Sequence, residues 1–79
     1  MPQVVPLDLM SVGEVGRIVD VAGDEPLVRR LAEMGLRVGA RVRMQQTGRP
    51  CIVAVGDQRL SLRGDDELTI LVQIGDGEP

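Results

Sequence analysis

Few side chains in this sequence could perform chemistry. The chain of 79 residues has no histidine and no lysine, so the Ser11 and Ser61 hydroxyls and the Cys51 thiol lack the usual base that activates a nucleophile. The neighbouring acids Asp24 and Glu25 fall at a turn, where carboxylates usually stay solvated or cap a helix. The sequence therefore predicts that the chain is not an enzyme.

Metal and phosphate sites also find little support. A single cysteine without histidine excludes the zinc patterns built from Cys and His pairs, and Cys51 lies in an apolar run, which is typical of a small buried side chain. The carboxylates of residues 65–67 could hold a hard cation weakly. The glycines of 13–16 and 35–39 lack the spacing of phosphate-binding loops and are typical of turns. We expect no metal site and no cofactor.

The charges are spread unevenly along the chain. All nine basic residues are arginine, and the stretch 29–43 carries five of them with Glu33 as its one acid. Two interpretations remain open: a cationic face for an acidic partner, or a solvated surface whose charges neutralise one another. Nucleic acid binding is disfavoured because the sequence pI is about 4.7 and aromatic residues are absent. The lack of aromatics also disfavours binding of proline-rich peptides.

Alternating apolar and polar residues indicate short strands. The pattern predicts five of them, at residues 15–22, 40–45, 51–55, 59–63 and 68–74. Ile18 and Val19 are both apolar, which predicts a bulge in the first strand. A tight hairpin is expected at 56–58 and a further turn, or a single helical turn, at 64–67.

The segments around the first strand have their own signals. Residues 1–6 are predicted to be a loose lead-in, because Pro2 and Pro6 lack the N–H that strand pairing needs. Residues 7–11 are predicted to form a short turn that closes one end of the core. A helix is expected at 25–34, with an apolar stripe formed by Leu27, Leu31 and Met34 at i, i+4 and i+7.

Together these elements predict a mainly β fold, a small barrel of about five strands with one short helix inserted after the first strand. One domain is expected over residues 1–79, with its core at about 7–74. The N-terminus lacks the basic region of a signal peptide, and no apolar run is long enough to span a membrane. We therefore expect a cytoplasmic protein without direct membrane insertion.

The string Arg30-Leu31-Ala32-Glu33-Met34-Gly35-Leu36-x-x-Gly39 resembles the FeoA family, small cytoplasmic proteins of bacterial ferrous iron transport. The resemblance covers about residues 7–73. It extends to Leu7-x-Leu9-x-x-x-Gly13, Arg17-Ile18-Val19, Gly48-Arg49-Pro50, Leu60-x-Leu62-Arg63 and Ile70-x-Val72. One position departs from the family, which usually has a small residue where this chain has Glu67.

The resemblance implies an SH3-like barrel and a non-enzymatic accessory role. The implied partner is the membrane transporter FeoB, whose cytoplasmic part binds GTP, so recruitment to the inner face of the membrane is implied as well. The alternative is a regulatory domain related to the C-terminal domain of iron-dependent repressors, although the DNA-binding and metal-binding parts of such repressors are not in this sequence. A direct metal sensor or carrier is a further hypothesis.

Contact with a protein partner is the function that the residues leave open. We expect the contact surface on the helix and the turn after it, at Arg29, Arg30, Glu33, Met34, Leu36 and Arg37. In the alternative interpretation Leu31, Met34 and Leu36 belong to the core and only the arginines serve the partner. Self-association into a homo-oligomer through unpaired strand edges is a further hypothesis, with 51–55 as the segment most prone to such pairing.

Overall fold

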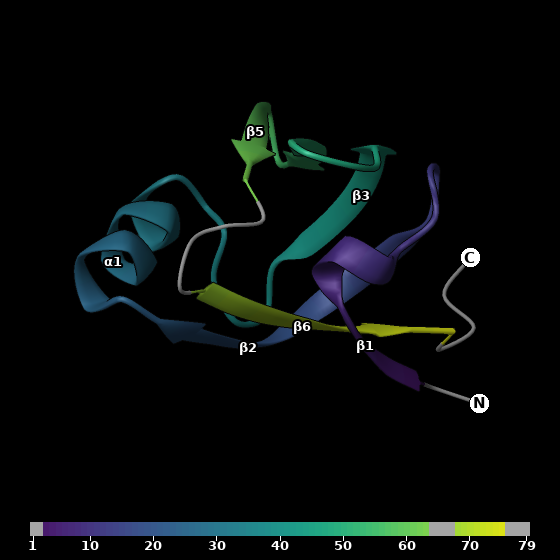
Figure 1. Cartoon of the computed structure of the whole chain (residues 1–79). Coiled ribbons are helices and arrows are strands. Elements are labelled where there is room, and N and C mark those ends of the chain that lie inside the picture. The colour runs from purple at the N-terminus through teal and green to yellow at the C-terminus, as the bar shows by residue number, and fades with distance from the viewer. Residues whose placement is uncertain (1–2, 64–67, 76–79) are drawn as a thin grey trace.

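The computed structural model describes residues 3–63 and 68–75, which form one antiparallel sheet with strand order β1-β6-β2-β3-β4-β5 (Figure 1). The elements in chain order are β1 (Gln3–Pro6), the 3-10 helix η1 (Leu7–Leu9), β2 (Val15–Gly23), α1 (Glu25–Glu33), β3 (Arg41–Gln46), β4 (Cys51–Val55), β5 (Gln58–Leu62) and β6 (Leu68–Ile74). The predicted mainly β fold with one helix is confirmed. The predicted turn at 64–67 and the departure at Glu67 lie outside the described residues.

The sheet folds over on itself and encloses the core. Figure 1 shows β3 and β5 above β2, β6 and β1, with α1 at one side. The two layers contribute aliphatic side chains with at most 1% exposure, Ile18 and Val72 from below and Val42, Met44 and Val53 from above. Because the chain has no aromatic residue, close packing of these branched and flexible side chains must fill the interior.

The structure has one strand more than the sequence predicts. The expected loose lead-in is wrong for Gln3–Pro6, because this segment pairs with β6, with Val5 opposite Val72 and Pro6 opposite Leu71. Strand β1 lies at the edge of the sheet and Pro6 is its last residue, which is where a strand tolerates a missing N–H.

Helix α1 begins and ends close to the predicted residues. The carboxylate of Asp24 accepts a hydrogen bond from the backbone N–H of Leu27 at 3.3 Å, and Pro26 sits in the first turn. The helix ends before Gly35, whose φ of +98° is one that favours glycine. Leu31 is buried, whereas Leu27 and Met34 are partly buried against the core, so the predicted apolar stripe does dock on the sheet.

Two local predictions about the first half of the chain are confirmed. The register of β2 against β6 shifts between Ile18 and Asp20, which is the expected bulge. The segment after β1 does close one end of the core, because Leu7 in η1 and Met10 just beyond it are both buried.

Strand β4 is not an edge. It pairs with β3 on one side and with β5 on the other, so the prediction that 51–55 is the segment most open to edge pairing is wrong. Within the described residues, the edges of the sheet are β1 and β5. Alternation of apolar and polar residues does not show which strands lie at the edges, since strand order depends on which segments meet in space.

Candidate interaction surface

The structure brings no reactive constellation together in its described part. Ser11 and Ser61 are exposed, and Cys51 is buried at the start of β4. Burial raises the pKa of the Cys51 thiol, and the charge of Asp8 raises it further, against a backbone hydrogen bond that lowers it. The thiol is therefore a protonated, packed side chain at neutral pH rather than an activated nucleophile.

A metal site finds no support in the described ranges either. Within residues 3–63 and 68–75, no three Cys, Asp or Glu side chains come together in a way that could hold an ion. The carboxylates of 65–67, named above as a weak cation site, lie outside these ranges. The same ranges contain no helix with the length and hydropathy that a membrane crossing requires.

The six residues expected to contact a partner fall into two groups. Arg29, Arg30 and Glu33 on α1, and Arg37 in the following turn, are exposed. Met34 is half-buried against the core, and Leu36 has 0% exposure. Leu36 therefore belongs to the interior, as the alternative interpretation held, and the accessible part of the helix surface is made by its charged residues.

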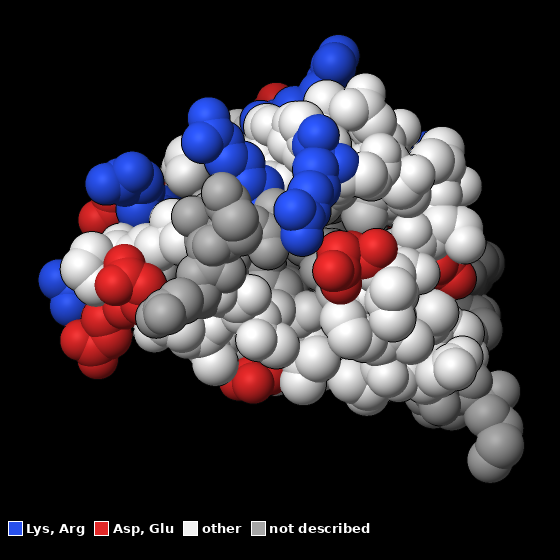
Figure 2. All heavy atoms as spheres, in the orientation of Figure 1, with Lys and Arg blue, Asp and Glu red and all other residues white. Residues whose placement is uncertain are grey.

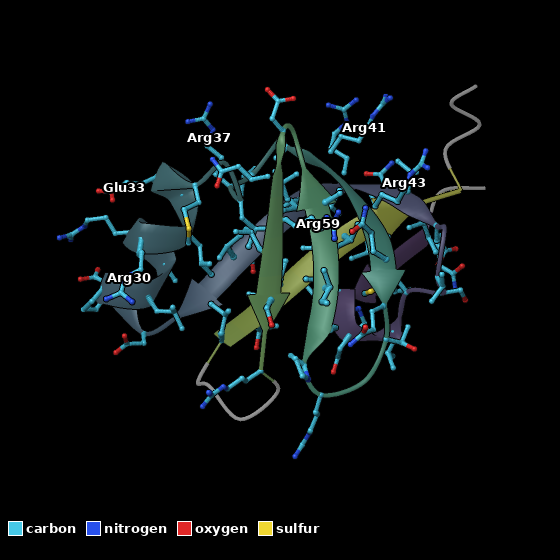
Figure 3. All side chains as sticks on the ribbon, turned by 90° about the horizontal axis from the view of Figure 1, so that it is seen from above. Arg30, Glu33, Arg37, Arg41, Arg43 and Arg59 are labelled. Carbon is cyan, nitrogen blue, oxygen red and sulfur yellow. The ribbon has the colours of Figure 1, made fainter. Side chains whose placement is uncertain are left out.

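The local fold explains this division. The backbone N–H of Leu36 donates to the Leu31 carbonyl at 2.9 Å, which turns the chain back over the last turn of α1. The Leu36 side chain is thereby carried inward, while Arg37 remains exposed on the same turn. Figure 3 shows Arg30 and Glu33 on α1 at one end of the molecule, away from the arginines of the sheet.

A second group of arginines lies on the outer face of the sheet. On β3, Arg41 and Arg43 are exposed and alternate with the buried Val42 and Met44. The strand registers place Arg43 opposite Ala54 of β4, and Ala54 opposite Arg59 of β5. Figure 3, which looks onto this face, shows Arg59 between the helix and the two arginines of β3.

The sequence did not predict that Arg43 and Arg59 lie in one row across β3, β4 and β5. The alternation of apolar and polar residues in 40–45 and 59–63 does predict that the arginines of both segments point outward. Which arginine lies beside which depends on the register of β3, β4 and β5, and the irregular pairing between Met44 and Gln46 shows that this register is not a simple count along the chain.

The charges are segregated over the sheet and mixed near α1. In Figure 2 the basic side chains gather mainly over the layer formed by β3 and β5, and acidic side chains lie lower on the same face and near α1. All nine arginines are exposed. Of the two interpretations of the charge pattern, the described residues favour a cationic face, which attracts acidic groups over a Debye length of about 8 Å at physiological salt.

A groove of about 480 Å³ opens between η1 and the facing ends of β4, β5 and β6. Its apolar lining includes Leu7, Cys51, Leu62 and Ile70. Two arginines, Arg49 and Arg63, line it as well. This surface was not predicted, because its walls come from four segments that are distant in the sequence.

Comparisons with known proteins found a matching family and a similar solved structure. The FeoA domain family matches residues 5–74. Among solved structures, the crystal structure of an iron uptake regulatory protein (FeoA) is similar with a TM-score of 0.76 and 26% identity, covering 91% of this chain and 100% of that chain. Among curated proteins the comparison found no significant match.

Proposed function

This chain belongs to the FeoA family, and on that premise we propose that it is a non-enzymatic, cytoplasmic accessory protein of bacterial ferrous iron transport. Its mode of action is contact with the GTP-binding cytoplasmic region of an FeoB-type membrane transporter, which recruits it to the inner face of the membrane. Family membership supports the accessory role in iron transport, and the related crystal structure is described as an iron uptake regulatory protein, which favours regulation over carriage.

One observation carries the choice of protein contact over chemistry. The described residues gather no metal ligands and no activated nucleophile, whereas every arginine is exposed. Arginine suits such a role because its planar guanidinium pairs with carboxylates through two parallel hydrogen bonds.

The helix surface is the proposed contact for the transporter. It consists of Arg29, Arg30, Glu33 and Arg37, with the half-buried Met34 as its apolar element. None of these arginines has an ion-pair partner among the described residues, so their charges are available to a partner. Leu36 is left out of this surface because it is fully buried.

Titration of the purified GTP-binding domain with this chain tests the proposal. The double variant Arg29→Glu/Arg30→Glu should weaken binding by about tenfold or more, since each lost charged contact at an interface commonly costs over 1.4 kcal/mol. Arg43→Glu is the matched control, because it reverses an exposed arginine on the sheet and should change the affinity much less. Equal affinities for the unchanged chain and the double variant would remove the helix from the contact.

The repressor-like alternative makes a different prediction. A regulatory domain of that kind would associate with a DNA-binding protein rather than with the transporter's cytoplasmic region. The titration separates the two, because the alternative predicts no binding of the GTP-binding domain at all.

A further inference from the structure

Strand β5 has an unused edge. In the described sheet β4 pairs with one side of β5, and no strand pairs with the other side. No other helix or strand in the described ranges makes an extensive contact with β5. The backbone N–H and C=O groups along such an edge are able to pair with an extended segment of another chain.

The side chains of this edge alternate in character. Arg59 and Ser61 are exposed on the outer face, and Arg63, just beyond the strand, is exposed as well. Leu60 has 7% exposure and Leu62 is half-buried, so these two face the interior. An added strand would therefore meet positive charge on its outer side and aliphatic surface on its inner side.

The groove described above continues this inner surface. Leu62 and Arg63 line it at the end of β5, and so does Cys51 of β4, which pairs with Leu62. Leu7 of η1 and Ile70 of β6 add further apolar lining. Within the described residues, the groove lies where the end of β5 and the start of β6 do not pair, and apolar side chains of a segment beside β5 would enter it.

We propose that the β5 edge binds an extended acidic segment of a partner protein by strand addition, with one carboxylate on Arg59 of the outer face, a second on Arg63 where β5 ends at the groove, and alternate apolar side chains in the groove. Arg59 and Arg63 are four residues apart, which is about 13 Å along an extended strand at about 3.3 Å per residue. Two acidic residues of the partner segment should likewise be four residues apart, at positions i and i+4. Apolar residues should stand at i+1 and i+3 between them. The inference goes beyond the proposed function, because the helix surface plays no part in it.

Charge complementarity selects this occupant over the two obvious alternatives. A second copy of the chain pairing through its own β5 would add two more arginines to the same face, and like charges across neighbouring strands are unfavourable. A nucleic acid would find arginines but no aromatic side chain on which to stack a base, and the whole chain has a net charge of −3. Arginines on an edge also discourage chance pairing with apolar strands, and an acidic segment removes that obstacle.

Backbone amide NMR of the isotope-labelled chain with synthetic peptides tests the site. The probe is a peptide in which glutamate and valine alternate, and it should shift the amides of Gln58–Leu62 saturably while leaving those of α1 unchanged. A peptide with the same residues in two separate blocks, and an oligothymidylate, are the comparison ligands and should bind much more weakly. Shifts confined to α1, or binding of the oligothymidylate in preference to the probe, would overturn the proposal.

Charge reversal supplies the second arm. The variant Arg59→Glu/Arg63→Glu should bind the probe about tenfold more weakly or worse, whereas Arg30→Glu, a reversal on α1, should bind it as the unchanged chain does. The double variant should gain affinity for a peptide in which lysine and valine alternate. All three arginines are exposed, so the fold should persist, and the far-UV circular dichroism spectrum checks this. Equal probe affinities for the double variant and Arg30→Glu would refute the site.

Cys51 gives a readout that needs no variant. It is the chain's one cysteine, and it lines the groove with 5% exposure. The probe should slow alkylation of Cys51 by a maleimide, while a ligand bound only at α1 should not. An unchanged alkylation rate at saturating probe would show that the groove stays empty and would contradict the proposal. Because the peptides replace the transporter, these results do not depend on whether the GTP-binding domain binds.

Discussion

Arg43 and Arg59 lie on either side of Ala54, in one row across β3, β4 and β5. Two strand spacings of about 4.8 Å separate them, so the backbones of the two arginines are about 10 Å apart. Neither has an ion-pair partner among the described residues. The row is thus a small electrostatic cost to the fold.

Removing one of these charges should not weaken the fold. We expect Arg59→Gln to leave the free energy of unfolding unchanged or to raise it by up to about 0.5 kcal/mol at low salt. The gain should disappear at molar salt, where screening removes the repulsion. Thermal unfolding followed by circular dichroism at the two salt concentrations measures this. A marked loss of stability in Arg59→Gln would mean that the guanidinium makes a structural contact.

Leu36 and Val38 separate core from surface within one turn. Leu36 has 0% exposure and Val38 has 61%. Truncating a fully buried leucine leaves a cavity, so Leu36→Ala should lower the free energy of unfolding by about 2–5 kcal/mol, whereas Val38→Ala should change it by less than about 0.5 kcal/mol. Urea unfolding followed by circular dichroism compares the two, because the chain has no Trp or Tyr to report by fluorescence. Similar small losses for both variants would return Leu36 to the surface.

The region around Leu36 also shows which features could be predicted from the sequence. The string around Leu36 identified the family, and the period of Leu27, Leu31 and Met34 identified the helix and its buried stripe. Assigning Leu36 to the core or to the surface was beyond either argument. Its direction is set by the turn after α1, where its N–H donates to the Leu31 carbonyl.

The other differences between prediction and structure concern contacts between residues that are distant in the sequence. Alternation gave the inner and outer faces of β3 and β5, because it depends only on neighbouring residues. It could not show that Gln3–Pro6 pairs with β6, since proline near a chain end is equally typical of a loop and of an edge strand. The arginine row and the groove depend on register and strand order, which no single segment encodes.

Gly16 is expected to be intolerant of any side chain. It lies in β2 against β6, and a Cβ at this position would overlap Cγ1 of Val72 and lie 2.9 Å from the carbonyl oxygen of Gln73. Gly16→Ala should therefore destabilise the chain by more than about 2 kcal/mol or prevent folding. Gly13→Ala is the comparison. A Cβ there meets nothing within 4 Å, so its cost is confined to the positive φ of +90°, about 1–2 kcal/mol.

Chemical unfolding of these two glycine variants ranks them. If Gly13→Ala were the more damaging of the two, the close approach of β2 and β6 would be relaxed by a shift of the strands. The predicted order reflects overlap with the fully buried, β-branched side chain of Val72 and close approach to the Gln73 backbone, neither of which has the freedom of a flexible side-chain end to move aside.

Alkaline pH should report the burial of Cys51. Burial raises the pKa of its thiol above the ordinary value of 9.0. As the pH rises past 9, the unfolded chain loses the thiol proton before the folded chain does, so the free energy of unfolding falls; below about pH 8 the thiol is protonated in both states and has no effect. The chain has no lysine, tyrosine or histidine, so few other groups titrate in this range.

Cys51→Ala should flatten this decline. The variant will be less stable at neutral pH, because it loses packed volume, but its stability should vary less between pH 8 and 11. Parallel urea unfolding series of the two proteins across that range make the comparison. An identical alkaline decline in the variant would assign the effect to groups other than the thiol.

The most direct test of the account is a chemical-shift map of the isotope-labelled chain bound to the GTP-binding domain of its FeoB-type transporter. We predict saturable changes at Arg29, Arg30, Glu33 and Arg37, lost in Arg29→Glu/Arg30→Glu and kept in Arg43→Glu. A spectrum unchanged by excess domain, or changes that persist in the double variant, would contradict an accessory role exerted through the helix surface.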